Sequence, residues 1–125
     1  MDVLLSEEEK MLKNSAREFL EAECSTSLAR QMESDERGYP PGLWGKMSDL
    51  GWIGLALPEK YGGQGLPLTY LGIVLGEVGR AIAPVPLHST IVPALAISGD
   101  GTEEQQRRVL PEVARGDMLL TWALT

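Results

Sequence analysis

The chain has 125 residues, and 18 acidic against 11 basic residues give it a formal net charge of -7. A chain of this length forms one domain with one core, so it has no room for a cofactor domain and a separate substrate domain. It contains no run of lysine or arginine, which argues against nucleic acid as a partner because backbone phosphates need a basic surface.

The single cysteine and the hydropathy pattern bear on the compartment. Cys24 cannot form an internal disulfide, which is typical of a reducing environment. No stretch approaches the roughly 20 apolar residues that a membrane span requires, and a helix-like pattern follows Met1 and Asp2 directly, with no signal peptide. We therefore expect a cytoplasmic protein without a membrane span.

The first predicted helix begins at Ser6. Ser6 and Glu9 have the spacing of a capping box, and the acidic residues between them suit the first turn of a helix. An apolar stripe follows at helical spacing, formed by Leu12, Ala16, Phe19 and Leu20. Residues 24–36 continue this helix or form a second short one, which ends at the tandem prolines, 40 and 41.

A second apolar region follows these prolines. Pro41 suits the first position of a helix, and Gly51 suits its C-terminal cap. The residues predicted to be buried in this helix are Leu43, Trp44, Met47 and Leu50. The apolar run 52–57 is too short for a helix of its own, so the pattern predicts a buried extended segment there.

Three further helices are predicted, over residues 66–82, over 86–98 with Gly99 as its stop, and over 102–115. In the last of these, Thr102 and Gln105 repeat the capping-box spacing and Gly116 ends the helix. Residues 118–125 change to the pattern of a strand, which has no partner in a helical domain. The sequence therefore predicts an all-α fold, an orthogonal or up-down bundle of about five to six helices that ends in a short extended segment.

The glycine-rich stretch 58–80 is the first candidate site. A P-loop needs a lysine and a hydroxyl residue after its last glycine, and a dinucleotide fingerprint needs a preceding strand and a distant acid, so neither pattern is present. Residues 62–65 are better explained as a chain reversal. Gly72, Gly76 and Gly79 fall on one helical face, which favours tight packing against another helix, with a groove for a thin ligand as the alternative.

The remaining candidates are single side chains. His88 has no clustered ligands for a metal, Cys24 has no adjacent base, and no serine stands in a nucleophile elbow. Glu77 is a lone acid in an apolar helix, and its simplest role is an ion pair with Arg80 or another nearby base. These residues alone indicate only a soluble helical domain.

Three sequence blocks, taken together, carry a family resemblance. They are GWIGLALPEKYGGQGL at 51–66; GTEEQQ at 101–106 with LP at 110–111 and ARG at 114–116; and WALT at 122–125. In order and spacing they resemble the amino-terminal domain of acyl-CoA dehydrogenases, and the resemblance covers essentially the whole chain. Gly76 and Glu77 stand where that family usually has paired glutamates.

The resemblance implies a domain organisation. Residues 1–117 would be the family's amino-terminal helical domain, and residues 118–125 would begin the strand that enters a middle β domain, followed in the family by a carboxy-terminal four-helix bundle. The family oxidises acyl-CoA to trans-2-enoyl-CoA with FAD, using a carboxylate from the carboxy-terminal part, and passes electrons to an electron-transfer flavoprotein. We therefore assign no catalytic residue within these 125 residues, and we expect the chain alone to be inactive and not to retain FAD.

The resemblance also implies contact residues. Trp122, Ala123, Leu124 and Thr125 match the motif that lies against the flavin ring. The helices after the glycine turn form one wall of the acyl pocket in the family, and Pro86, Thr90 and Ala94 would face it from one stripe, where their small side chains leave room for a long or bulky acyl group.

Two expectations about partners remain open. An apolar face that other domains would cover predicts that copies of the chain associate into a homo-oligomer. The alternative function is a stand-alone helical interaction module without catalysis, which would use its groove and terminal strand to complete a partner.

Overall fold

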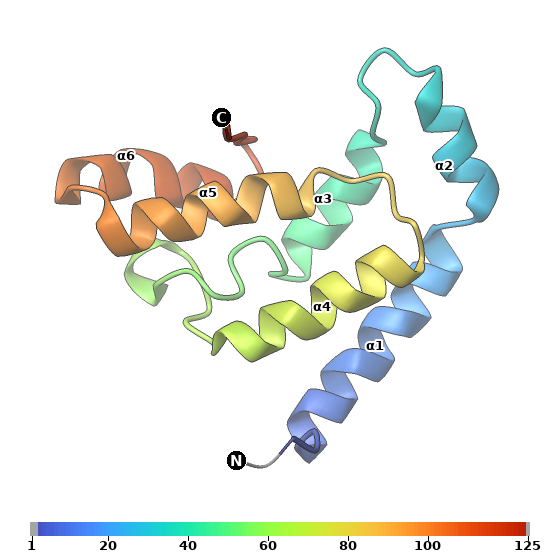
Figure 1. Ribbon diagram of the computed structural model, residues 1–125, viewed down its shortest axis with the longest axis horizontal. Coiled ribbons are helices and arrows are strands. Elements are labelled where there is room, and N and C mark those ends of the chain that lie inside the picture. The colour runs from blue at the N-terminus through green and yellow to red at the C-terminus, as the bar shows by residue number, and fades with distance from the viewer. Residues whose placement is uncertain (1–2, 125) are drawn as a thin grey trace.

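The computed structural model describes residues 3–124, and in this range it contains helices but no strand (Figure 1). The elements are α1 (Glu7–Glu23), α2 (Thr26–Glu33), α3 (Pro41–Asp49), the 3-10 helix η1 (Glu59–Tyr61), α4 (Leu68–Arg80), α5 (Leu87–Asp100) and α6 (Glu103–Ala114). The predicted all-α class is confirmed. No helix in the described range is long and apolar enough to cross a membrane.

Both predicted capping boxes are present. At the start of α1, the Ser6 hydroxyl accepts the Glu9 N–H at 3.1 Å, and the Glu9 carboxylate accepts the Ser6 N–H at 3.0 Å. Thr102 and Gln105 make the same reciprocal pair at the start of α6, at 3.1 and 2.9 Å. Each pair satisfies two amides that a helix start otherwise leaves without a partner, which is why these two boundaries could be read from sequence.

Three helix ends share one backbone motif. In α3, α4 and α6 the residue after the cap has a positive φ, and the next N–H bonds a carbonyl five residues back. This is the Schellman motif, in which glycine is usual at the left-handed position. The left-handed residues are Gly51, Ile82 and Gly116, respectively. Ile82, at φ 50°, is the exception, and a β-branched residue is strained in this conformation.

The helices pack in pairs. Helix α1 packs along α4, α5 packs along α6, and α6 also contacts η1. In the view of Figure 1 the α5–α6 pair lies above the α1–α4 pair, and the turn segment before α4 runs between them. The buried apolar side chains form one cluster, to which α1 contributes Ala16 and Leu20, α3 Leu43, Trp44 and Met47, α4 Leu71, Val74 and Val78, α5 Leu87, Ile91 and Ala94, and α6 Leu110 and Val113.

Some boundaries and burials differ from the predictions. Helix α4 begins two residues later than predicted and ends at Arg80, because Ile82 adopts the left-handed conformation. Helix α5 continues through Gly99 to Asp100, since an exposed glycine weakens a helix without stopping it. Leu50 is exposed rather than buried. Helix α3 ends just before it, and the chain reverses so that Trp52 enters the core instead.

The extended conformation predicted for residues 52–57 is wrong, although their burial is correct for all but half-buried Ala56. Backbone hydrogen bonds close local turns here: the Leu55 N–H donates to the Trp52 carbonyl, and the Leu57 N–H donates to the Gly54 carbonyl. After the chain reverses, residues 64–66 run back past these turns. Their amides donate to the carbonyls of residues 54, 57 and 55, respectively. Successive turns satisfy buried backbone groups here without a partner strand.

The tight packing predicted for the glycine face of α4 is also wrong for this chain. Nothing lies within 4 Å of where a Cβ would stand on Gly72, Gly76 or Gly79. All three are exposed. In the described structure this face of α4 is therefore open, and packing within this chain does not require the small residues.

Candidate functional site

The carboxy-terminal segment, residues 117–124, leaves α6 at Gly116 and forms neither helix nor strand. Thr125 lies outside the described residues. That this segment begins a strand of a following domain stays a prediction. Its side chains are largely open to solvent: Trp122 is 47% exposed and Leu124 is 81% exposed. The segment therefore presents apolar groups that the rest of the described chain does not cover.

The three residues predicted to line an acyl pocket do not share one surface. Pro86 is the cap of α5 and lines a hollow of about 350 Å3 with Tyr39 and Val85. Thr90 and Ala94, one and two turns further along α5, are fully buried in the core. Of the three, Pro86 is the residue that the structure places at an open hollow.

One hydrogen bond joins a residue of the first predicted set to the chain just before the second. The Leu120 N–H donates to the Thr90 hydroxyl at 3.4 Å. Leu120 stands two residues before Trp122, so the first turn of α5 lies beside the chain that leads into the predicted flavin segment. The structure thus places the first turn of the predicted substrate helix next to the chain just before the predicted cofactor segment, which the sequence pattern alone did not establish.

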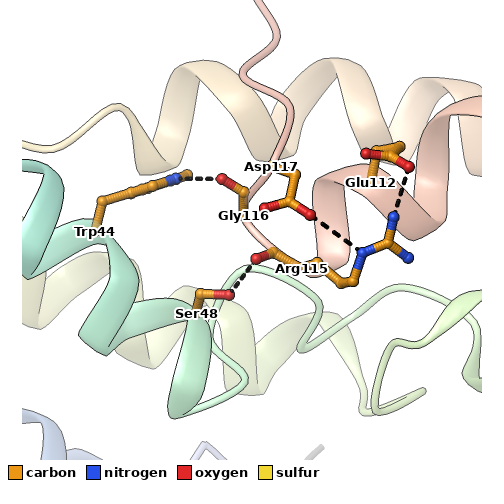
Figure 2. A network of polar contacts seen from close by, with 6 residues as sticks. All are labelled: Trp44, Ser48, Glu112, Arg115, Gly116 and Asp117. Carbon is orange, nitrogen blue, oxygen red and sulfur yellow. Dashed lines mark hydrogen bonds and ion pairs between the residues drawn. The ribbon is translucent and has the colours of Figure 1, made fainter.

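Helix α3 holds the chain just before this segment, at the end of α6. The Trp44 indole N–H donates to the Gly116 carbonyl at 3.1 Å, and the Ser48 hydroxyl donates to the Arg115 carbonyl at 2.7 Å (Figure 2). The Arg115 guanidinium points to the other side, where Glu112 and Asp117 pair with it. Sequence reasoning predicted that Trp44 is buried but missed this role; the available signal was that a buried indole N–H needs an acceptor.

The buried acid of α4 has an ion-pair partner on α1. Glu77 is 5% exposed, and both its oxygens accept from Arg17, at 2.9 and 3.1 Å. The hydrogen bond from Arg17 lowers the pKa of Glu77, and the same bond raises the pKa of Arg17. The prediction that Glu77 pairs with a nearby base is confirmed, with Arg17 as the base; Arg80 pairs with Glu21 instead, at 3.6 Å.

The other reactive side chains form no site within the described residues. Cys24 is half-buried at the end of α1, and burial, followed by the charge of Glu23, raises the pKa of its thiol. A raised pKa disfavours the thiolate that a nucleophile needs. His88 is exposed on α5. No group of three or more potential ligands within residues 3–124 could hold a metal ion.

The exposed segment fits the chemistry of a flavin ring. An isoalloxazine has a flat aromatic face and a polar edge that both donates and accepts hydrogen bonds. Trp122 offers a half-open aromatic side chain, and the backbone of residues 121–124 makes no hydrogen bond to another group in the described range. A segment with open backbone donors and acceptors beside an aromatic side chain suits such a ligand.

The helical fold of residues 3–124 can be compared with those of known proteins. The family model described as acyl-CoA dehydrogenase, N-terminal domain, matches residues 6–117. The chain belongs to this family, as its three sequence blocks predict.

Similar proteins agree with this assignment. Acyl-CoA dehydrogenase IpdE2 of Mycolicibacterium smegmatis is 33% identical over 113 residues, which are 90% of this chain and 35% of that protein. A variant of the Tcur3481-Tcur3483 steroid ACAD superposes with a TM-score of 0.84 at 42% identity, over 92% of this chain and 32% of that chain. An acyl-CoA dehydrogenase of Bacillus anthracis complexed with FAD superposes with a TM-score of 0.81 at 26% identity, over 93% of this chain and 20% of that chain. The chain thus spans about a third or less of the length of these proteins.

Proposed function

We propose that this chain supplies one wall of the flavin and acyl site of an FAD-dependent acyl-CoA dehydrogenase, which converts an acyl-CoA thioester to trans-2-enoyl-CoA. The observation that carries the proposal is the family match over residues 6–117, combined with an exposed segment at 121–124 that follows Leu120, the residue bonded to α5. The catalytic carboxylate would come from another part of the complete enzyme, so the chain alone is inactive.

The cofactor role falls on residues 122–125. Trp122 would lie against the flavin ring and exclude water from it, and the open backbone groups of Ala123 and Leu124 would bond its polar edge. The hydroxyl of Thr125, outside the described residues, adds a further donor. When bound, FAD supplies the acceptor for the hydride that leaves the β carbon of the substrate.

The substrate role falls on the start of α5. Pro86 borders the hollow beside Tyr39 and Val85, and buried Thr90 and Ala94 set the position of the helix behind that wall. Val85→Phe in the complete enzyme would fill the hollow, and kcat/KM should shift toward shorter acyl groups. Ser98→Ala, near the far end of α5, is the control; an unchanged chain-length profile in Val85→Phe would remove this part of the proposal.

The partners follow from the reaction. Electrons leaving the flavin pass to an electron-transfer flavoprotein, and the enzyme acts in the cytoplasm as a homo-oligomer. The open apolar side chains at residues 119, 122 and 124 support association with further polypeptide, because patches of this kind are seldom left exposed on a monomer.

The test uses the polypeptide encoded by the complete gene that carries these 125 residues. After purification it should show the visible absorbance of a bound flavin, and a panel of acyl-CoA thioesters should reduce an artificial electron acceptor in its presence. The 125-residue chain, purified alone, should show neither. If the complete gene product contains no flavin and reduces no acceptor with any thioester, the enzymatic proposal fails and the stand-alone interaction module is favoured.

A further inference from the structure

The chain leaving α6 is tied at three points to side chains that lie far away in sequence. Ser48 bonds the Arg115 carbonyl at 2.7 Å and Trp44 bonds the Gly116 carbonyl at 3.1 Å, both from α3 (Figure 2). Thr90 of α5 accepts the Leu120 N–H at 3.4 Å. The path of residues 115–120 is therefore set from two helices, and all three bonds are to backbone atoms.

The burial of two of these side chains makes their bonds hard to replace. Trp44 is 5% exposed and Thr90 is 0% exposed, so water has little access to the indole N–H or to the hydroxyl. An indole has one donor, and leaving it without an acceptor in the core carries the full desolvation cost of the N–H group. The alternative positions of the segment, in which these bonds are broken, are correspondingly disfavoured.

The close approach of the segment to α3 is a second sign of a fixed path. A Cβ on Gly116 would stand 3.0 Å from the Cβ and Oγ of Ser48 and 3.3 Å from Cδ1 of Ile53. Gly116 also has φ +78°, where a side chain is disfavoured. Glycine at this point lets the backbone approach Ser48 closely enough for the 2.7 Å bond to form beside it.

We propose that Trp44, Ser48 and Thr90 are positioning residues for the cofactor-facing segment 121–124. This proposal rests on the proposed function of that segment and adds residues that do not touch the cofactor themselves. The three bonds fix the direction in which the chain leaves the helical domain, so that Trp122 and the open backbone groups after it are presented in one arrangement. The exposed ion pairs of Arg115 lie on the same stretch but contribute little to this, because solvent screens them.

The first test measures amide hydrogen exchange in the 125-residue chain. Ser48→Ala and Thr90→Val each remove one bond while nearly keeping the side-chain volume, and Trp44→Phe removes the indole N–H while keeping an aromatic ring. The combination of Ser48→Ala with Thr90→Val should speed exchange of the hydrogen-bonded Asp117 and Leu120 amides about tenfold, with core amides of α1 and α4 unchanged. Arg115→Gln, the matched control on the same segment, should leave exchange within about twofold of wild type.

The second test measures flavin retention in the complete gene product. Trp44→Phe and Ser48→Ala should weaken FAD binding or shift the flavin absorption spectrum. Ser48→Thr should show the wild-type FAD binding and spectrum because it keeps the hydroxyl. Arg115→Gln should have no effect on either. Equal exchange rates in all variants would overturn the anchoring, whatever the flavin result. Faster exchange with unaltered flavin binding would overturn the positioning role. A wild-type protein without flavin would instead overturn the proposed function, so the failures can be told apart.

Discussion

The glycines of the turn segment and those of α4 stand a few residues apart in sequence but in opposite environments. In the turn, a Cβ on Gly63 would stand 2.2 Å from the Leu57 carbonyl oxygen, so the fold of this chain admits no side chain there. On α4, nothing approaches the corresponding point of Gly72, Gly76 or Gly79 within 4 Å. A run of glycines in a sequence can therefore combine residues that the fold requires with residues that it only tolerates.

The largest expected effect tests the turn side of this comparison. Gly63→Ala forces a methyl group against the backbone of Leu57, which cannot move as a flexible side chain could. We expect the free energy of unfolding to fall by about 3 kcal/mol. Urea unfolding followed by circular dichroism measures it, and a loss below about 0.5 kcal/mol would mean that the turn repacks easily.

The buried side of α4 provides the next test, because Glu77 lies on the same helix as the open glycines. Glu77→Gln should lower the free energy of unfolding at pH 7 by about 2 kcal/mol, an amount reduced from that of a fully buried pair because Arg17 is partly exposed. Glu21→Gln, which removes the exposed pair with Arg80, should cost less than about 0.5 kcal/mol.

The pH dependence of the same pair has a definite sign. The pKa of Glu77 is lowered in the folded state from a usual value of 4.5, chiefly by the hydrogen bond from Arg17. Its stabilising contribution is therefore complete above pH 4.5 and is lost as the pH falls through the lower folded-state pKa. Urea midpoints of wild type and Glu77→Gln should converge toward acid pH; a constant gap down to the acid transition would contradict the assignment.

A smaller effect, of opposite direction, tests the open face. Gly72→Ala and Gly76→Ala should each raise the free energy of unfolding by about 0.5 to 1 kcal/mol, since alanine restricts the unfolded chain and meets no neighbour in the folded one. Gly45→Ala is the matched control, because it stands in α3 with equally open surroundings. If the α4 variants were destabilised while Gly45→Ala was stabilised, the two kinds of glycine would not differ as described.

The smallest expected effect concerns the end of α4. Ile82→Gly removes the left-handed strain of a β-branched residue but gives the unfolded chain more freedom, so the net gain should be about 0.5 kcal/mol. Ile82 is exposed, and little burial is lost. Ile82→Val keeps the strain and should show no gain in stability. The difference between the thermal unfolding midpoints of the two variants measures the effect of relieving the strain.

Local signals explain how much of the fold could be predicted. The capping boxes at Ser6 and Thr102 and the glycine ends of α3 and α6 act within five residues of chain, so they could be read without the fold. The turns at 52–57 could not be predicted in this way, because their burial and their hydrogen bonds depend on residues 64–66, which lie against them only after the chain reverses. An apolar run between two breakers has the same composition whether it extends or turns.

Long-range contacts explain what was missed in the candidate site. Sequence reasoning selected Thr90 for its small side chain on a helical stripe, whereas its observed contact is a hydrogen bond to Leu120, thirty residues later. Ser48 and Trp44 reach residues 67 and 72 positions away, and no local pattern encodes such a meeting. The partner of Glu77 likewise depends on α1 packing against α4, which placed Arg17 nearer than Arg80.

The three tryptophans stand in three different environments. Trp44 donates to a backbone carbonyl, Trp52 packs edge-on against Phe19 with ring centroids 5.2 Å apart, and Trp122 remains half open to solvent. A collisional quencher such as acrylamide should reach the indole of Trp122 first. The emission it removes would then report docking of the terminal segment onto any other polypeptide, so the chain carries an intrinsic fluorescent probe that needs no label.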